Sequence, residues 1–277
     1  MTKELTIAFI GGGNMATALG AGLIGKRCGA HDVHVVDPNA PVLERWKQQG
    51  TSVAPQPDET LASRRVWIFA VKPQYMKQAV QNCRPYLRDD TLVISIAAGI
   101  SSATLGVWLG APEQPWTRLI RCMPNTPALI GAGASGLMAG QGVSEDDKMV
   151  AQQLMRAVGE VVWVGSDHEI DAVTSLSGSG PAYVFLFIDA LIQGGVKQGL
   201  SEDQARTLAL ATLTGATQLA ALSHESLAVL RERVTSKGGT TAAALGVFED
   251  RQFFGIVQAA MQAAADRAAG LSVEFSL

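Results

Sequence analysis

The chain has 277 residues, which is long enough for two medium-sized domains with an ample apolar core. Its formal net charge is -3 and its 22 lysines and arginines form no run, so the sequence favours a small ligand over nucleic acid or an anionic membrane surface. Cys28, Cys83 and Cys122 are far apart and the histidines do not cluster, which argues against a disulfide framework and against a metal site.

Targeting signals are not evident in the sequence. No apolar stretch is expected to cross a membrane, and the N-terminus has no basic region followed by an apolar segment and a cleavage site. We therefore expect a cytoplasmic protein with buried thiols. The four histidines, His31, His34, His168 and His224, are most simply surface or capping residues.

The rest of the chain is organised around residues 6–23, TIAFIGGGNMATALGAGL. The apolar run ending at Ile10 predicts a buried strand, and a helix is expected after the glycines. The spacing of Gly11, Gly13 and Ala16 is G-x-G-x-x-A, in which glycines allow a tight turn and a close approach to a pyrophosphate. The pyrophosphate would lie at the helix N-terminus, with Gly11, Gly12, Gly13, Asn14 and Met15 as candidate ligands. A glycine-rich turn without a ligand is the alternative.

The second predicted strand, Val33–Val36, ends at Asp37, about twenty residues beyond the glycines. A carboxylate at this point of a dinucleotide site accepts hydrogen bonds from the adenosine ribose and repels a 2′-phosphate, which favours NAD. The alternative is a turn made by Asp37, Pro38 and Asn39. The residues alone leave both open.

Further strands are predicted at residues 66–71, 92–96 and 118–122, with helices at 42–49, 75–84 and 101–109. This alternation predicts a doubly wound parallel sheet of the Rossmann type. Loops after the strands of such a sheet lie at its carboxyl edge, where ligands bind. These loops and the last residues of the strands before them contain the candidate cofactor-binding residues Ala70, Val71, Lys72, Pro73, Ala97, Ala98 and Asn125. Each loop taken singly is also compatible with ordinary strand punctuation.

The second half of the chain changes in character. A helix from Ser144 to about Val158 and a strand at 161–164 close the sheet, and helices are then predicted at 168–176, 181–198, 202–222, 226–234, 241–249 and 252–269. We place a dinucleotide-binding domain at residues 1–165 and an all-α dimerisation domain at 166–277. Residues 205–221 are largely apolar around the helix, so we expect burial against a second copy and a homo-oligomer.

Two glycine-rich stretches interrupt the helical half. They are LSGSGPAY, residues 176–183, and VTSKGGTTAAAL, residues 234–245. The second predicts a helix N-terminus with free N–H groups and hydroxyls, suited to a carboxylate. A capped helix start without a ligand is the alternative for each.

These stretches carry a family resemblance. Together with GGGNMA, AVKPQ (70–74) and RCMPNTPA (121–128), the segments DAVTSLSGSGPAYVFLFIDAL (171–191) and VTSKGGTTAAAL resemble pyrroline-5-carboxylate reductase over nearly the whole chain. The resemblance implies a Rossmann domain, a helical dimerisation domain and reduction of L-1-pyrroline-5-carboxylate to L-proline, the last step of proline biosynthesis. It also implies a homodimer through the C-terminal helices, or a decamer of five dimers.

The resemblance also implies site residues. Residues 70–73 would line the cofactor, and Ser236, Gly239, Thr240 and Thr241 would hold the substrate, with the Thr241 hydroxyl facing the imine nitrogen. Lys237 stands where the family usually has proline. Glu225 and Ser226 stand near the position of a histidine–proline pair that is frequent in the family. The family favours NADPH as cofactor, with NADH as the alternative.

Two other functions compete with this one. A β-hydroxyacid dehydrogenase has a similar domain plan, but its motif G-x-G-x-x-x-K supplies a lysine for proton transfer, and Val184 occupies that position here. A non-catalytic dinucleotide sensor would be expected to lose the second site, whereas residues 236–241 retain it.

Overall fold

The computed structural model describes residues 5–275, and the chain forms two compact units. Unit 1 comprises the chain up to Ser179 together with the return segment from Ala264, and unit 2 comprises Gly180–Ala263. The expected functional boundary at residue 165 lies within unit 1, so the compact units and the expected domains divide the chain differently.

Unit 1 is built on one sheet of eight strands in the order β3-β2-β1-β4-β5-β6-β7-β8. The strands are β1 (Ile7–Ile10), β2 (Val33–Val36), β3 (Ser52–Ala54), β4 (Val66–Phe69), β5 (Leu92–Ser95), β6 (Leu119–Met123), β7 (Gly133–Ala139) and β8 (Gly159–Trp163). The central strand β1 pairs in parallel with β2 and β4, and Ile7 lies opposite both Val33 and Val66. The order changes direction at β1, which places the glycine loop at the switch point of a doubly wound sheet.

Two strands and one pairing direction differ from the expectation. The short strand β3 and the strand β7 were not predicted, and β7 pairs antiparallel with β6. The sequence of β7, GASGLMA, has little β-branched character, so its pattern does not indicate a strand. A Cβ on Gly136 would lie 2.7 Å from a methyl group of Val173, so close packing of a helix explains that glycine.

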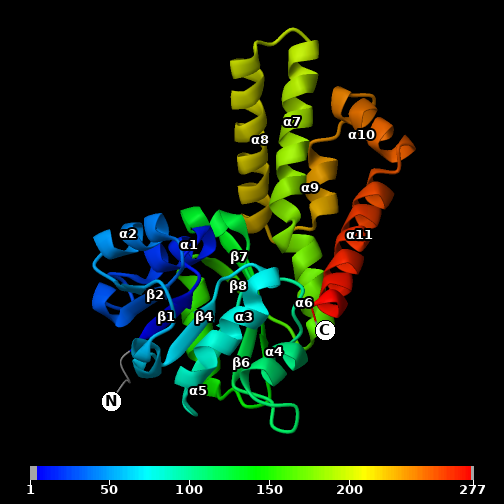
Figure 1. Ribbon diagram of the computed structural model, residues 1–277. Helices are drawn as coiled ribbons and strands as arrows, with labels where there is room; N and C mark the ends of the chain where they lie inside the picture. The colour runs from blue at the N-terminus through cyan, green and yellow to red at the C-terminus, as the bar shows by residue number, and fades with distance from the viewer. Residues whose placement is uncertain (1–4, 276–277) are drawn as a thin grey trace. The chain divides into compact units, whose positions relative to one another are not determined.

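Helices cover both faces of this sheet (Figure 1). One core joins β1 to α1 (Asn14–Leu23), α2 (Ala40–Gln48) and α5 (Glu145–Arg156), and the other joins the sheet to α3 (Pro73–Cys83) and α4 (Ser102–Leu109). Short 3-10 helices lie at Ala30–Asp32, Glu59–Ser63, Arg84–Tyr86 and Thr126–Ile130. The predicted α/β alternation is confirmed. The parallel strands end at one sheet edge, which is where ligands of open α/β sheets generally bind.

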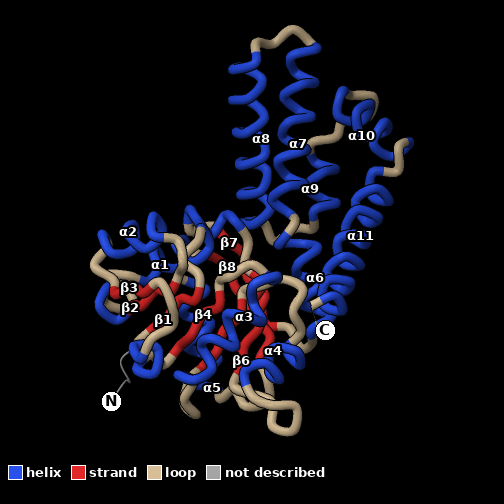
Figure 2. Tube along the Cα trace, in the orientation of Figure 1, coloured by secondary structure: helices blue, strands red, loops and turns tan. Residues whose placement is uncertain are grey.

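After the sheet the chain is helical to its described end, as expected (Figure 2). The helices are α6 (Asp167–Val173), the π-helix Thr174–Gly178, α7 (Gly180–Lys197), α8 (Glu202–Leu222), α9 (Leu227–Arg233), α10 (Thr240–Asp250) and α11 (Phe253–Glu274). Within unit 2, α7 and α8 run side by side (Figure 1). The end of α11 belongs to unit 1, where Leu271 lies against Gly99 and Phe275 packs on the sheet core.

The helices of unit 2 expose an unusual amount of apolar surface. Phe185 and Leu186 of α7 are 65% and 71% exposed, and Leu208 and Leu219 of α8 are 56% and 59% exposed. The helical stretch Asp167–Lys197 is also long and apolar enough to cross a membrane by length and composition, which corrects the expectation that no segment would be. A single helix of this kind is weak support for a membrane span. Permanent subunit interfaces are also strongly apolar.

Candidate cofactor and substrate sites

The glycine loop begins where β1 ends. Gly11 has φ +96°, and its N–H donates to the carbonyl of Val36 at 2.8 Å. A Cβ at Gly11 would lie 2.7 Å from the carbonyl oxygen of Ala70, at the end of the neighbouring strand β4. Both the left-handed backbone and this approach require glycine, so the first glycine of the motif has the turn-forming role predicted for it.

The backbone N–H of Gly12 is hydrogen-bonded, whereas, in the described part of the chain, those of the three residues after it are not. The Gly12 N–H donates to Asp37 Oδ2 at 2.8 Å. The N–H groups of Gly13, Asn14 and Met15 open α1 and have no hydrogen-bond partner among the described residues. A Cβ at Gly13 would meet no atom within 4 Å, and the first turn of α1 has no acidic residue. This open, acid-free helix start fits a pyrophosphate.

Asp37 lies half-buried at the end of β2 and is bonded on both oxygens. Oδ2 accepts the Gly12 N–H and Oδ1 accepts the Asn39 N–H, each at 2.8 Å. The turn role considered for Asp37 is therefore present, with an added bond to the glycine loop that the sequence did not indicate. Each carboxylate oxygen keeps a further lone pair, so the ribose role stays a prediction.

The loops after β4 and β5 follow parallel strands at the same sheet edge. Ala70 follows β4 and donates its N–H to the carbonyl of Ile10 at 2.7 Å, while Lys72 and Pro73 begin α3. After β5, Ala97 is buried and Ala98 half-buried. Val71 is half-buried and packs on the sheet core. These placements agree with a cofactor lying along the carboxyl edge.

Asn125 has a structural role that its sequence position did not reveal. Its Nδ2 donates to the carbonyl of Ser177 at 3.0 Å, and its Oδ1 accepts the N–H of Ala134 at 2.8 Å. The side chain thus ties the loop after β6 to β7 and to the π-helix Thr174–Gly178. Its assignment to the cofactor stays a prediction, and the bonds observed here fix the loop itself.

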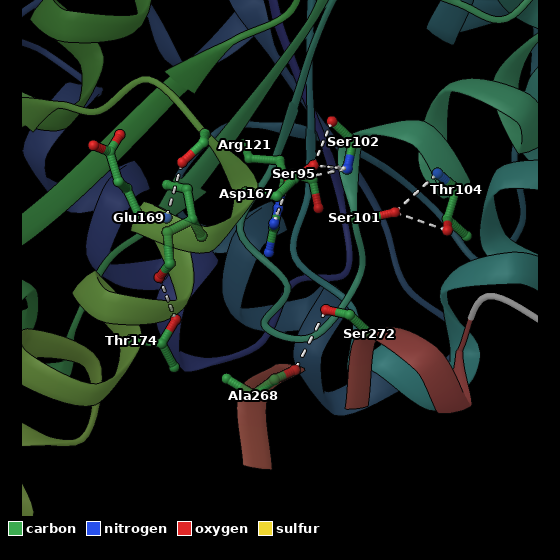
Figure 3. A network of polar contacts seen from close by, with 12 residues as sticks. Ser95, Ser101, Ser102, Thr104, Arg121, Asp167, Glu169, Thr174, Ala268 and Ser272 are labelled. Carbon is green, nitrogen blue, oxygen red and sulfur yellow. Dashed lines mark hydrogen bonds and ion pairs between the residues drawn. The ribbon is translucent and has the colours of Figure 1, made fainter. Parts of the chain in front are cut away.

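A buried ionic network joins three elements near this edge (Figure 3). Arg121 of β6 is 2% exposed and forms an ion pair with Asp167, the first residue of α6. Asp167 also accepts hydrogen bonds from the N–H and the hydroxyl of Ser102, at 3.1 and 2.7 Å, at the start of α4. The network links a central strand to both helices, and an arginine inside the apolar strand LIRCM is the one sequence signal that indicated it.

The carboxyl groups of this network have opposite pKa shifts. Burial acts to raise the pKa of Asp167, but the hydrogen bonds from Arg121 and Ser102 outweigh it and leave that pKa below its ordinary value. Burial raises the pKa of Asp171, with Arg121 opposing. Arg121 Nη2 and Asp171 Oδ1 have no hydrogen-bond partner in the part of the chain that is described.

The substrate loop precedes α10 in unit 2. Gly238 has φ +73° and allows the turn, and Gly239 is the N-cap residue of α10. The Gly239 N–H already donates to the carbonyl of Ser236 at 3.0 Å, so it is not the free amide that the sequence suggested. Within residues 5–275, the amides of Thr240 and Thr241 and the hydroxyls of Ser236, Thr240 and Thr241 have no hydrogen-bond partner.

The residues that depart from the family pattern hold this loop's entry helix. Ser226 caps α9 by accepting the Val229 N–H at 3.3 Å, and Glu225 pairs with Arg233 at 2.6 Å across the same helix. Lys237 is exposed in the turn. The loop that carries Ser236 therefore starts from a helix fixed at both ends.

The cysteines and His34 differ in how deeply they are buried. Cys83 and Cys122 are buried, and burial raises the pKa of each thiol to about 12, as expected for inert thiols. Cys28 is only half-buried. His34 is not a surface residue: it lies buried in β2, bonds Ser52 Oγ through Nδ1, and burial lowers its pKa. Among the described residues, no three His, Cys, Asp or Glu side chains gather as metal ligands.

Two sequence families match the two parts of the chain that carry the candidate sites. The sequence model for pyrroline-5-carboxylate reductase dimerisation matches residues 167–271, and a model for NADP oxidoreductase, coenzyme F420-dependent, matches residues 6–99. A pyrroline-5-carboxylate reductase of Pseudomonas aeruginosa is 44% identical over 269 residues, covering 96% of each chain. One from Pisum sativum is 38% identical over 275 residues, covering 98% of each chain.

Solved structures give the same result. A pyrroline-5-carboxylate reductase of Coxiella burnetii has a TM-score of 0.90 and 36% identity, covering 98% of this chain and 99% of that one. A pyrroline carboxylate reductase of Plasmodium falciparum with NADP bound has a TM-score of 0.86 and 28% identity, covering 98% of this chain and 100% of that one. With its Rossmann sheet and helical dimerisation domain, this chain belongs to the pyrroline-5-carboxylate reductase family, a family of oligomeric NAD(P)H-dependent oxidoreductases.

Proposed function

We propose that this chain reduces L-1-pyrroline-5-carboxylate to L-proline with NADPH as the preferred hydride donor, using two helix N-termini to hold the two anionic reactants. One observation carries the proposal. Both α1 and α10 begin at glycines, have no acidic residue in the first turn and present N–H groups that have no partner within the described chain. Each is suited to an anion, the first to a pyrophosphate and the second to a carboxylate.

On the cofactor side, the N–H groups of Gly13, Asn14 and Met15 would bind the pyrophosphate, and Gly11 and Gly12 would shape the loop. The further lining residues are those predicted from the sequence: Asp37, Ala70, Val71, Lys72, Pro73, Ala97, Ala98 and Asn125. When bound, the reduced dinucleotide supplies the hydride. The chain's own task is to orient it and to exclude water from the reacting face.

On the substrate side, the amides of Thr240 and Thr241 and the Ser236 hydroxyl would anchor the carboxylate, with Gly239 keeping the backbone close. This revises the sequence-based assignment, since the Gly239 amide is engaged in the turn. The unpartnered Thr241 hydroxyl accepts a hydrogen bond from the protonated imine nitrogen and returns one to the amine of the product. A protonated cyclic imine accepts hydride readily, so the site needs positioning and no strong general acid.

The alternative of a β-hydroxyacid dehydrogenase requires a proton-transfer residue in the helix after the second glycine pair. Val184 lies at that position, in α7, and is apolar. The chain therefore lacks the group that alcohol oxidation would need there.

The finer assembly and location are also part of this proposal. We infer a homodimer formed through the exposed apolar faces of α7 and α8, a decamer of five dimers being the larger assembly to look for, and a cytoplasmic protein without a membrane-bound form. Support comes from the match of residues 167–271 to a dimerisation family and from the exposure of Phe185 and Leu186.

A steady-state assay with pyrroline-5-carboxylate tests the function. Loss of reduced-nicotinamide absorbance is followed with NADPH and with NADH, and proline is identified as the product. Turnover with at least one cofactor and a larger kcat/KM for NADPH are expected. No turnover with either would refute the proposed activity.

A further inference from the structure

Trp46 is a buried tryptophan of α2 that contacts the glycine loop. It is 1% exposed, and its ring packs on Phe9 of β1 with the ring centroids 5.4 Å apart. Its indole N–H donates a buried hydrogen bond of 2.9 Å to the carbonyl oxygen of Gly12. Both α1 and α2 pack on the same sheet face, so this bond connects two helices through the loop (Figure 1).

Gly12 is held on its other side as well. Its N–H donates to Asp37 Oδ2 at 2.8 Å, so both of its backbone polar groups are engaged by the segment from β2 to α2. A Cβ at Gly12 would lie 2.7 Å from Val42 Cγ1 and 2.8 Å from Trp46 Nε1. Glycine is needed here so that Trp46 and Val42 can approach, which is a different reason from that at Gly11.

Because the peptide bond is planar, the hydrogen bond from Trp46 to Gly12 also affects the N–H of Gly13. The carbonyl of Gly12 and the N–H of Gly13 belong to one planar peptide unit and point in opposite directions. A donor that fixes the Gly12 oxygen therefore also fixes the direction of the Gly13 N–H. That N–H is one of the donors left without a partner at the start of α1, within the described residues.

We propose that Trp46 is a positioning residue for the dinucleotide: by holding the Gly12 carbonyl, it aims the Gly13 N–H at the pyrophosphate before the cofactor arrives. The proposal rests on the proposed cofactor site and assigns a residue to it that the dinucleotide motif does not contain. Pre-organised donors bind more tightly because binding no longer has to order them. The pyrophosphate is common to NADPH and NADH, so Trp46 acts on both cofactors alike.

The test replaces the donor and keeps an aromatic ring. In Trp46→Phe, the dissociation constants of NADPH and NADH, measured by calorimetry, are expected to rise together by about threefold to tenfold, the range for one lost hydrogen bond. The ratio of the two constants should stay the same. At saturating cofactor, kcat should remain within about twofold, because the hydride-transfer residues are untouched.

Trp67→Phe is the matched control. Trp67 of β4 is also fully buried and donates its indole N–H to the carbonyl of Leu61 at 3.1 Å, but it belongs to the core on the opposite face of the sheet. This variant loses the same chemical bond and is expected to lose a similar amount of thermal stability. Its dissociation constants for both cofactors should match those of the unaltered protein.

The outcomes separate the two proposals. Unchanged constants in Trp46→Phe, an equal rise in Trp67→Phe, or a change in the NADPH-to-NADH ratio would each overturn the role of Trp46. An unaltered protein that binds neither cofactor would instead refute the proposed site. If Trp46→Phe does not accumulate folded, 3-benzothienylalanine inserted at position 46 keeps the bicyclic ring, removes only the N–H, and decides the question by the same measurements.

Discussion

At the scale of single residues, the two proposed anion sites differ in how firmly their donors are set. Around α1, Asp37 and Trp46 occupy the backbone groups of Gly12, and a glycine is required by contact at both Gly11 and Gly12. Around α10, Gly239 is engaged within its own turn, and the hydroxyls that follow have no partner within residues 5–275. The substrate loop therefore depends on its ligand for order more than the glycine loop does.

Thr241→Ala tests the substrate side. Thr241 lies in the first turn of α10 behind the N-cap Gly239, so its loss removes no cap and the fold should be unaffected. The value of kcat is expected to fall by roughly tenfold to a hundredfold, the low end for a positioned proton-bonding group. Thr241→Ser should retain most of the activity. If Thr241→Ala, with normal melting temperature and cofactor affinity, turned over within about twofold of the parent, the amides alone would anchor the substrate and water would serve the nitrogen.

Asp37→Ser tests cofactor selectivity. Removing the carboxylate removes its repulsion of a 2′-phosphate, so the ratio of kcat/KM for NADPH over NADH should rise by about fivefold, or about 1 kcal/mol at a part-solvated site. Affinity for both should also drop, since serine is too short to keep both backbone bonds. Asp37→Asn, which retains an acceptor oxygen, should show the same shift in ratio with a smaller general loss. A constant ratio in both variants would make Asp37 a loop residue only.

At the scale of elements, Asp167 holds three of them together. It pairs with the buried Arg121 of β6 and accepts two bonds from Ser102 at the start of α4, while itself beginning α6 (Figure 3). The π-helix Thr174–Gly178, of sequence TSLSG, follows α6 directly and is tied to Asn125. The network thus fixes the segment that leads from the sheet into unit 2.

Removing the carboxylate should therefore be costly. Asp167→Ala leaves Arg121 buried and unpaired, and we expect a loss of about 2 to 3 kcal/mol, less than for a fully buried pair because Asp167 is 35% exposed. The double variant Arg121→Leu with Asp167→Ala should lose less than the sum of the two single variants. Chemical denaturation of the four proteins measures this coupling, and strictly additive losses would contradict it.

The pH dependence follows from the lowered pKa values of Asp167 and Asp147. For Asp147, burial acts to raise the pKa, but bonds from Arg118 and Ser144 outweigh it. A carboxyl whose folded pKa lies below its unfolded value stabilises the protein above the unfolded pKa, and loses that contribution as pH falls through the folded one. Unfolding free energy should therefore decline below about pH 4. Asp147→Asn should flatten that decline, and an identical acid profile would refute the assignment.

The sequence predicted the elements that have a local pattern, and it missed those that depend on contacts between distant segments. Apolar runs located β1, β2, β4, β5 and β6, because strands buried on both faces are largely apolar. The edge strand β8 was also located by its valines, although its residues are only partly buried or exposed. The strand β7 was missed because its sequence is rich in small residues. Gly136 is needed because Val173 packs closely against it, and the sequence does not show that contact. Motif positions were found by spacing, but the roles of the buried Trp46 and Arg121 and of the partly buried Asp167 depend on contacts between distant segments, and single-residue patterns do not encode these.

At the scale of the whole molecule, the two units are stabilised differently. The sheet of unit 1 carries two buried cores, whereas the described residues of unit 2 contain few buried side chains and many exposed apolar ones. The helical half matches a dimerisation family, and α7 and α8 carry the apolar surface through which we proposed that two copies associate. Hydrophobic burial in unit 2 is therefore largely a property of the assembly.

The assembly should be at least dimeric at micromolar concentration in sedimentation velocity. Phe185→Glu combined with Leu186→Glu should dissociate it or leave it aggregating, because charges would be placed in an apolar contact. Met149→Glu, on the exposed side of α5 in unit 1, is the control and should sediment like the parent. A monomeric parent protein would contradict the inferred interface.

The return of α11 to unit 1 has a consequence for the entropy of the chain. The segment 180–263 leaves unit 1 at Ser179 and rejoins it at Ala264, with Leu271 seated on Gly99 and Phe275 in the sheet core. While unit 1 remains folded, both ends of an unfolded helical segment are pinned, as they would be in a cross-linked loop. Pinning of this kind removes conformations that a free chain would explore, which lowers the entropic cost of folding the segment by about 4.5 kcal/mol for a loop of this length. The contacts of Leu271 and Phe275 with unit 1 thereby restrict the conformations that the unfolded helical segment can adopt, which favours its refolding.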